Sequence, residues 1–209
     1  MPYICDVNFQ LFKLIAMQYH VVTFTHTKIF GWAVYLHAHV KYLKKLLKED
    51  KLQISGPGVG TPVRSAQLVF KVTDRAELDQ LVAGDPYSIH GLVASSTVNL
   101  WDVKFGSMLK PSVPDADGTK YFRATYEFKE GTDTSAVEAE HAAYVEKLLS
   151  EKKLRASGPY VNNSLAGLSI LSVADAVAAE AIVKADPYVE KLAATWQIIQ
   201  WDPKFGDFK

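Results

Sequence analysis

The stretch HVKYLKKLLKEDKLQISGP (residues 39–57) recurs 102 positions later as HAAYVEKLLSEKKLRASGP (residues 141–159). Without a gap, 11 of these 19 positions are identical, where average composition gives roughly one by chance. Two copies of about 90 residues are too few and too long for a solenoid of stacked repeats. The repeat therefore predicts a small domain that is present twice in one chain.

The repeat continues on both sides of this stretch and sets the domain boundaries. Asp-Pro-Tyr at residues 85–87 returns at 186–188, and WDVKFG at 101–106 returns as WDPKFG at 201–206. The offset falls from 102 to 101 and then to 100, so two single-residue length changes suffice. We predict four segments: an N-terminal extension (1–16), a first domain (17–106), a linker rich in proline, aspartate and glycine (107–119), and a second domain (120–209).

Each copy has the same predicted order of elements. Alternating apolar residues predict strands and a 3.6-residue period predicts helices, while Asp74 and Glu77 form a capping-box pattern at the start of the second helix. We expect Ser55-Gly56-Pro57 to end regular structure. In the first copy the predicted strands are 19–25, 52–54, 66–72 and 97–101, and the predicted helices are 37–49 and 75–84. Predicted strands of the second copy include 121–128, 168–173 and 195–200.

The order β-α-β-β-α-β is that of the ferredoxin-like unit, an α+β fold. One such unit has helices on a single face of its sheet, so its other face needs a cover. Two units in one chain can supply that cover for each other by packing sheet on sheet. We therefore expect tandem ferredoxin-like domains packed as an intramolecular pseudo-dimer with a barrel-like core, with further homo-oligomerisation left open.

Composition excludes several classes of protein. The 209 residues (23.2 kDa) contain 23 Lys and Arg and 23 Asp and Glu, so the chain lacks the basic excess that non-specific nucleic-acid binding needs. Cys5 is the only cysteine, which rules out an internal disulfide or a cysteine-rich metal site. No apolar run approaches the roughly 20 residues of a membrane span. We expect a cytoplasmic protein that binds neither nucleic acid nor a membrane.

In both copies the ordered residues resemble the YciI-like (YCII-related) family of the dimeric α/β barrel superfamily. The marks are a histidine early in the first helix, Leu-Leu, Ser-Gly-Pro, Asp-Pro-Tyr and a Trp in the last strand. They are His39, Leu46, Leu47, Ser55-Gly56-Pro57, Asp85-Pro86-Tyr87 and Trp101, and then His141, Leu148, Leu149, Ser157-Gly158-Pro159, Asp186-Pro187-Tyr188 and Trp201. The resemblance implies a His/Asp pair in a cavity between sheet and helices, and one relative uses such a pair to eliminate chloride from a chlorinated hydroxyhydroquinone.

The pairs His39 with Asp85 and His141 with Asp186 are the candidate catalytic residues. Histidine titrates near neutrality and suits proton transfer, and a neighbouring carboxylate fixes its tautomer. The alternative is purely structural, because Asp before Pro is also a common helix start. Possible substrate-binding residues, each also compatible with simple packing, are Tyr42, Ser55, Tyr87 and Trp101 in the first copy and Tyr144, Ser157, Tyr188 and Trp201 in the second. We expect no metal, because His37 and His39 would lie about 200° apart on a helix.

Three functions remain open at this stage. The first is a cofactor-independent lyase or isomerase, similar to the dehydrochlorinase, acting on a small ring-shaped substrate. The second is a non-catalytic binding or sensor module that uses the same cavities, and the third is a purely structural role. Because the copies differ around their histidines, with His26 matched by Phe128, we expect two similar cavities of which one has lost or changed its ligand.

Overall fold

A computed structural model describes residues 17–26, 31–108 and 118–206 of the chain. The predicted extension 1–16 with Cys5, and residues 109–117 of the predicted linker, lie outside the described residues. The first half contains β1 (Gln18–His26), α1 (Gly31–Lys48), β2 (Leu52–Val59), β3 (Arg64–Val72), α2 (Arg75–Ala83), α3 (Pro86–Ile89), β4 (Ser95–Trp101) and β5 (Phe105–Gly106). The second half contains β6 (Lys120–Glu127), α4 (Ser135–Ser150), β7 (Leu154–Pro159), β8 (Ala166–Val173), α5 (Ala176–Lys184), α6 (Pro187–Leu192), β9 (Thr195–Trp201) and β10 (Phe205–Gly206).

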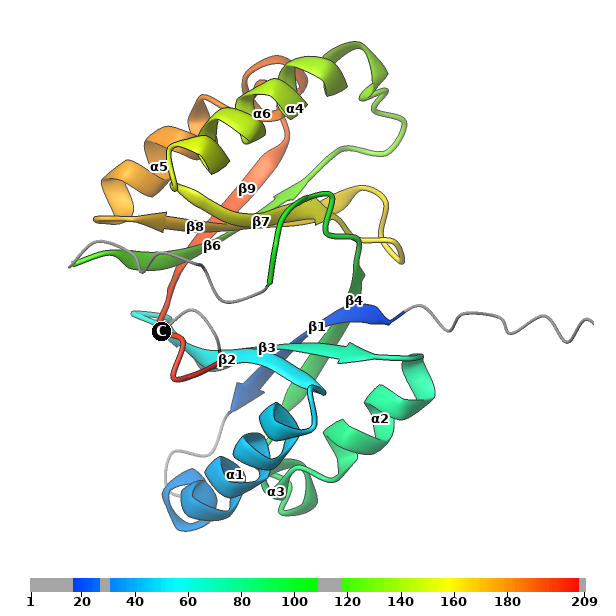
Figure 1. The fold of residues 1–209 in the computed structure, drawn as a ribbon, viewed down its shortest axis with the longest axis vertical. Helices are drawn as coiled ribbons and strands as arrows, with labels where there is room; N and C mark the ends of the chain where they lie inside the picture. Colours follow the sequence, from blue (N-terminus) through cyan, green and yellow to red (C-terminus); the bar gives the residue numbers. More distant parts are fainter. Residues whose placement is uncertain (1–16, 27–30, 109–117, 207–209) are drawn as a thin grey trace, which may run out of the picture.

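Each half forms an antiparallel four-stranded sheet with its helices on one face. The strand orders are β4-β1-β3-β2 and β9-β6-β8-β7, which is the ferredoxin-like order in both cases. In Figure 1 the two sheets face each other across the middle of the molecule, with α1–α3 below and α4–α6 above. The predicted α+β fold of tandem ferredoxin-like units is confirmed.

The two sheets join at both edges and enclose a shared core. Strand β2 pairs with β9 through Gly58 and Trp201, and a bridge between Trp101 and Tyr160 makes the equivalent link on the other side. The indoles of Trp101 and Trp201 are almost fully buried in this core. Their Nε1–H groups donate to the carbonyl oxygens of Gly158 (3.0 Å) and Gly56 (2.9 Å), so each tryptophan fastens one half to the other.

The repeated tails after β4 and β9 cross between the halves. Strand β5 pairs with β7 of the second half, and β10 pairs with β2 of the first half. This crossing explains why our prediction for Ser55-Gly56-Pro57 is wrong: these residues lie inside β2, which continues to Val59. A Cβ on Gly56 would overlap the backbone carbonyl of Asp202. The glycine therefore marks a close approach of two backbones within a continuing strand.

The first helix is longer than predicted. It begins at Gly31 instead of residue 37, so His39 lies in its third turn and not near its start. The apolar stripe that includes Leu36 and Val40 begins one turn earlier, at Trp32, which lines the same cavity as both of them. The start of α2 is as predicted, since Asp74 accepts from the backbone N–H of Glu77 at 2.8 Å. No helix in the described part of the chain has the length and apolar character needed to cross a membrane.

Candidate functional site

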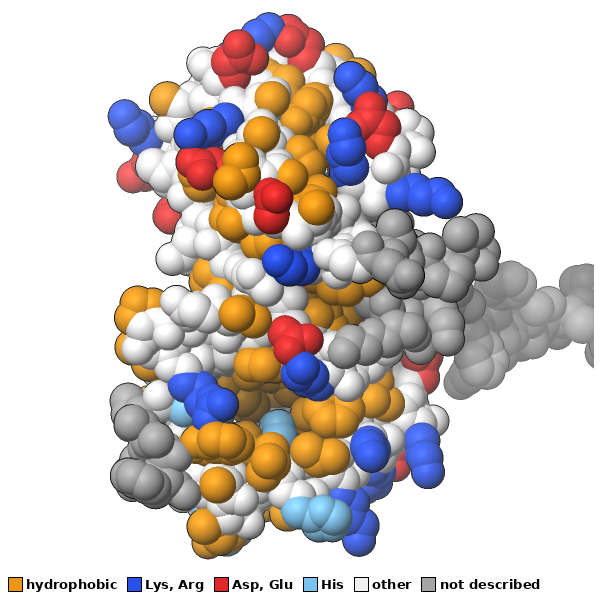
Figure 2. All heavy atoms as spheres, turned by 90° about the vertical axis from the view of Figure 1, so that its left-hand side faces the viewer, with side chains coloured by type: hydrophobic (Ala, Val, Ile, Leu, Met, Phe, Trp, Pro, Cys, Tyr) orange, Lys and Arg blue, Asp and Glu red, His pale blue; other side chains and the backbone are white. Residues whose placement is uncertain are grey.

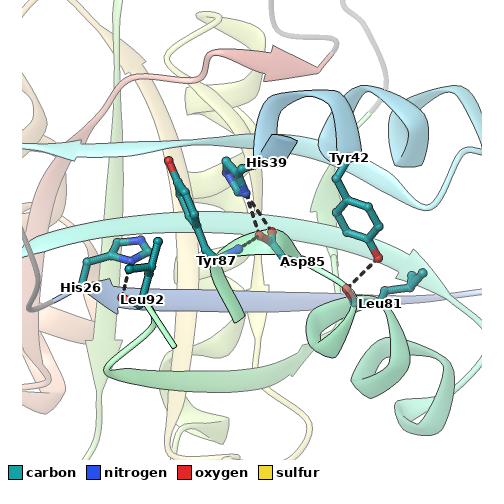
Figure 3. Close-up of polar contacts among 7 residues, drawn as sticks. All are labelled: His26, His39, Tyr42, Leu81, Asp85, Tyr87 and Leu92. Atoms are coloured by element: carbon teal, nitrogen blue, oxygen red, sulfur yellow. Dashed lines mark hydrogen bonds and ion pairs between the residues drawn. The ribbon is translucent and has the colours of Figure 1, made fainter. Parts of the chain in front are cut away.

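His39 and Asp85 are brought together from α1 and the start of α3. The Nδ1 atom of His39 lies 2.8 and 2.9 Å from the two carboxylate oxygens of Asp85. One of these oxygens also accepts from the backbone N–H of Tyr87 at 2.8 Å, so Asp85 caps α3 and orients the histidine at once (Figure 3). An ionised carboxylate only accepts hydrogen bonds. Nδ1 therefore carries the proton, and Nε2 is the nitrogen left for a ligand.

Tyr87 covers one face of the histidine ring. Its ring lies parallel to that of His39, with centroids 4.0 Å apart and planes within 10°. Burial, and next the charge of Asp85, raise the pKa of the Tyr87 phenol, so this hydroxyl remains a hydrogen-bond donor at neutral pH. The ring of Tyr87 also lies edge-on to the ring of His26 on β1. The Nδ1 atom of His26 is hydrogen-bonded to the carbonyl oxygen of Leu92 at 3.0 Å. Burial, and to a smaller extent the nearby His39, lower the pKa of His26.

A cavity of about 170 Å³ opens beside this cluster. In Figure 2 it is the hollow in the lower half of the molecule, walled by hydrophobic side chains with a histidine at its base. Its lining combines α1, three strands of the first sheet, α3 and the tail of the second half, so the site is complete only when both halves are present. The lining residues are His26, Trp32, Leu36, His39, Val40, Leu43, Ser55, Gly56, Pro57, Arg64, Ser65, Ala66, Tyr87, Lys204 and Phe205.

The candidate residues of the first half fall into two groups. His39, Ser55 and Tyr87 line the cavity, with Asp85 directly behind His39. Tyr42 does not line it, because its hydroxyl donates to the carbonyl of Leu81 at 2.8 Å (Figure 3). Trp101 lies in the core between the two sheets. The structure thus gathers the histidine, aspartate, tyrosine and serine and leaves Tyr42 and Trp101 in packing positions.

The second half repeats the cluster without the open cavity. His141 Nδ1 lies 2.9 Å from Asp186, and Tyr188 stacks on His141 at 3.9 Å and 13°. The side-chain exposure is reversed, however: His39 is 12% exposed and Asp85 3%, whereas His141 is 5% exposed and Asp186 17%. The space beside Asp186 and Tyr188 amounts to only about 20 Å³ and does not reach His141.

Two aromatic substitutions distinguish the second copy around Tyr188. Tyr126 stands where the first half has Phe24, and its ring occupies the position that a Cβ on Gly167 would need. Phe128 stands where the first half has His26, and it contacts both Tyr126 and Tyr188. Both rings also pack against Tyr188, at centroid separations of 6.0 and 5.0 Å.

The other candidate residues of the second half lie away from an open site. Ser157 is fully buried, and its hydroxyl shares a hydrogen bond of 2.7 Å with that of Ser169. Tyr144 donates to the carbonyl of Ile182, and Trp201 lies in the inter-sheet core. Burial, and next the charge of Asp186, raise the pKa of Tyr144 to about 12.

Several residues of the cavity were missed from sequence. Trp32 lies outside the predicted helix, and Lys204 and Phe205 reach the first-half cavity only because the tails cross over. Arg64 lies opposite His26 in the β1–β3 register. The predicted strands 19–25 and 66–72 do not include either residue. One signal was present in the sequence: at two of these positions, Trp32 and Arg64, the copies differ, which is where a ligand site in one copy would leave its mark.

Groups able to hold a metal are absent from the part of the chain the structure describes, since it brings no three His, Cys, Asp or Glu side chains together in that way. The cavity instead combines the Nε2 atom of His39 and the phenol of Tyr87 with a mostly apolar wall. This combination is suited to binding a small, partly apolar molecule and moving a proton on it.

Solved structures with the same fold span most of the chain. A candidate monooxygenase from Lactobacillus acidophilus NCFM is 11% identical, with 92% of this chain and 97% of that chain covered and a TM-score of 0.61. The chlorite dismutase of Candidatus Nitrospira defluvii, in complex with imidazole, is 10% identical, with 88% and 91% covered and a TM-score of 0.60. At these identities the likeness shows a shared fold.

A shorter match is a 5-chloro-2-hydroxyhydroquinone dehydrochlorinase from Burkholderia phenoliruptrix AC1100, in complex with 2,5-dihydroxybenzoquinone. It is 24% identical, with 40% of this chain and 94% of that chain covered and a TM-score of 0.34. No curated protein is significantly similar to the chain in sequence.

The family comparison accounts for most of the chain. The YCII-related domain matches twice, at residues 33–102 and 119–202, once in each half. The two matches together cover well over half of the sequence. The chain therefore belongs to the YCII-related domain family and carries two copies of its domain.

Proposed function

We propose that the first half holds a cofactor-independent active site of the lyase or isomerase kind, in which His39 moves a proton on a small ring-shaped substrate. Asp85 is its positioning partner, and the second half contributes Phe205 to the cavity wall. The observation that carries this proposal is that His39, held by Asp85 through Nδ1, lines an open cavity of single-ring size.

The chemistry follows from the roles of the ring nitrogens. With Nδ1–H donated to Asp85, Nε2 takes a proton from an acidic C–H or O–H group of the ligand. The imidazolium that forms faces the Asp85 carboxylate, which stabilises its charge. An isomerase step ends when Nε2 returns the proton to another carbon. A lyase step ends when the carbanion expels a leaving group as an anion.

The surroundings support such a step. The apolar lining limits water at the base, and the Tyr87 hydroxyl can donate to an oxygen on which negative charge develops. Positioned acid–base catalysis of this kind contributes about 10²–10⁴-fold in rate. All proton-handling groups in the proposal are side chains of this chain.

One observation favours a second candidate, a non-catalytic ligand-binding or sensor module. The His/Asp/Tyr arrangement is kept in the second half, where the cavity is nearly filled. The arrangement therefore also ties the long helix of each half to the short helix after Asp-Pro, independently of any ligand. In this candidate His39 contributes a hydrogen bond to the ligand and no proton transfer.

Deuterium exchange distinguishes the two candidates. Hydroxylated benzenes and unsaturated lactones are incubated in D2O with the protein, and loss of C–H signals is followed by NMR. We expect exchange of at least one compound about 10²-fold above the buffer rate, abolished in His39→Gln and retained in the matched control His141→Gln. Ligands that bind without exchange in the wild type, or an unchanged rate in His39→Gln, would contradict the catalytic proposal.

A further inference from the structure

The mouth of the first-half cavity carries positive charge that the proton-transfer site does not use. Its charged lining residues are Arg64 and Lys204, and the lining contains no carboxylate. Lys204 is already paired with Asp202. For Arg64, no ion pair is formed within the described part of the chain, so its guanidinium is the charge available to a ligand.

Arg64 is held in place by an aromatic surface. Its Cζ atom lies 3.8 Å from the centroid of the Trp32 ring, a cation–π geometry. This stacking uses the face of the guanidinium and leaves its in-plane N–H donors for an acceptor. The indole Nε1–H of Trp32 is itself buried and has no acceptor among the described residues. The guanidinium of Arg64 is therefore the charged donor that this side of the cavity offers to a ligand.

The second half lacks this arrangement at the same positions. In the first half Arg64 lies opposite His26 in the strand register. In the second half the carbonyl of Leu165 accepts a hydrogen bond from the N–H of Phe128, the counterpart of His26, so Leu165 stands at the position of Arg64. Thr134 stands at the position of Trp32, and Glu138 at that of Leu36. The cation–aromatic pair therefore occurs only in the half that has the open cavity, which links it to the ligand and not to the fold.

From these observations we infer that the ligand of the first-half cavity is a small planar ring bearing a carboxylate, with the carboxylate held by Arg64. The inference rests on the proposed function in taking this cavity as the ligand site. A dry cavity of about 150 Å³ holds one benzene ring, so a cavity of about 170 Å³ accepts a single substituted ring. The planar fork of an arginine matches both oxygens of a carboxylate. The ring then lies among Leu36, Val40 and Phe205, within reach of His39.

Three probes of the same shape and different charge test this. Benzoate (negative), benzamide (neutral) and benzamidine (positive) are titrated by calorimetry into the wild-type protein at low salt. We expect benzoate to bind about 10-fold or more tightly than benzamide, as a charge-assisted hydrogen bond implies, and benzamidine to bind weakest. In Arg64→Gln the ratio of benzoate to benzamide affinity should fall to within about twofold, while Arg64→Lys keeps part of it.

The matched control is Lys204→Gln, which removes the other positive charge of the lining and should keep the preference for benzoate. These titrations measure binding without turnover, so a protein that shows no deuterium exchange can still show the preference for benzoate. Conversely, a protein that exchanges deuterium can lack this preference, and the two proposals therefore fail separately. Equal affinity for the three probes, no benzoate binding, or an unchanged preference in Arg64→Gln would each overturn the inference.

Discussion

Tyr87 lies parallel to His39 at a ring separation of 4.0 Å, and this stack joins the short helix after Asp85 to the long first helix. The pair Tyr188 and His141 repeats it at 3.9 Å in a half whose cavity is almost filled. The same cluster is thus present once with an open cavity and once without. The chain provides its own control for separating structural from functional roles.

The two aspartates should separate these roles directly. Asp85→Asn loses a charge-assisted hydrogen bond to His39 and should lower the free energy of unfolding by about 1–3 kcal/mol, and it should slow deuterium exchange. Asp186→Asn should destabilise to a smaller extent, because Asp186 is more exposed, and leave exchange unchanged. Urea denaturation and the NMR exchange assay measure the two effects. A loss of exchange in Asp186→Asn would show that the second half also acts on the ligand.

Copying the aromatic filling of the second half should close the first cavity. In the double variant Phe24→Tyr with Ala66→Gly, the new tyrosine hydroxyl can lie against a glycine on the neighbouring strand, as Tyr126 lies against Gly167 in the second half. We expect the affinity for a ring ligand to fall at least 10-fold, the equivalent of about 1.4 kcal/mol, with little change in thermal stability. The reverse pair, Tyr126→Phe with Gly167→Ala, should leave binding unchanged. Undiminished affinity in the first double variant would place the ligand elsewhere.

Gly56 should tolerate no side chain. Because the carbonyl of Asp202 occupies the space of a Cβ, Gly56→Ala should push β2 away from the crossing tail and cost about 1–3 kcal/mol of unfolding free energy. Gly60 offers the comparison: it has a φ of 71° with nothing within 4 Å, so Gly60→Ala has only backbone strain, about 1–2 kcal/mol. Melting temperatures of both variants test this. A loss well below about 1 kcal/mol in Gly56→Ala would rule out the close approach.

Acid should destabilise the protein through His26. Its pKa is lowered in the folded state, so the unfolded chain takes up its proton first as pH falls. The stability that the neutral ring contributes is fully present above the unfolded pKa of about 6.5 and is lost as the pH falls below that value toward the folded pKa. His26→Phe, which copies Phe128, should remove this part of the loss. Urea denaturation midpoints of the wild type and of His26→Phe, measured from about pH 7.5 down to about pH 5, give the size of this effect. Identical pH profiles for the two proteins would exclude His26 as a cause of the acid destabilisation.

The internal repeat made the fold predictable from sequence. Alternation and helical periodicity located the strands and helices, and the half-covered sheet required the second copy as its partner. The sequence pattern could not show the crossing of the tails, because Ser55-Gly56-Pro57 looks like a turn until Asp202 is known to lie against it. For the same reason no pattern in the sequence links Phe205 to the first-half cavity.

The candidate site was predictable in its central residues only. The His39–Asp85 pairing followed from the family resemblance, and the geometry agrees with it. Arg64 and Trp32 meet through strand register and helix phase, which local patterns do not determine. The contact of Tyr126 with Gly167 in the second half likewise depends on how the strands pack, which is set by the tertiary structure.

The central claim, one ligand site in the first half served by His39, is tested most directly by a crystal structure of the full chain soaked with benzoate. We expect one benzoate per chain, with its ring in the first-half cavity beside His39 and its carboxylate on Arg64. Benzoate beside His141, equal occupancy in both halves, or a first-half cavity left empty at saturating concentration would contradict the account.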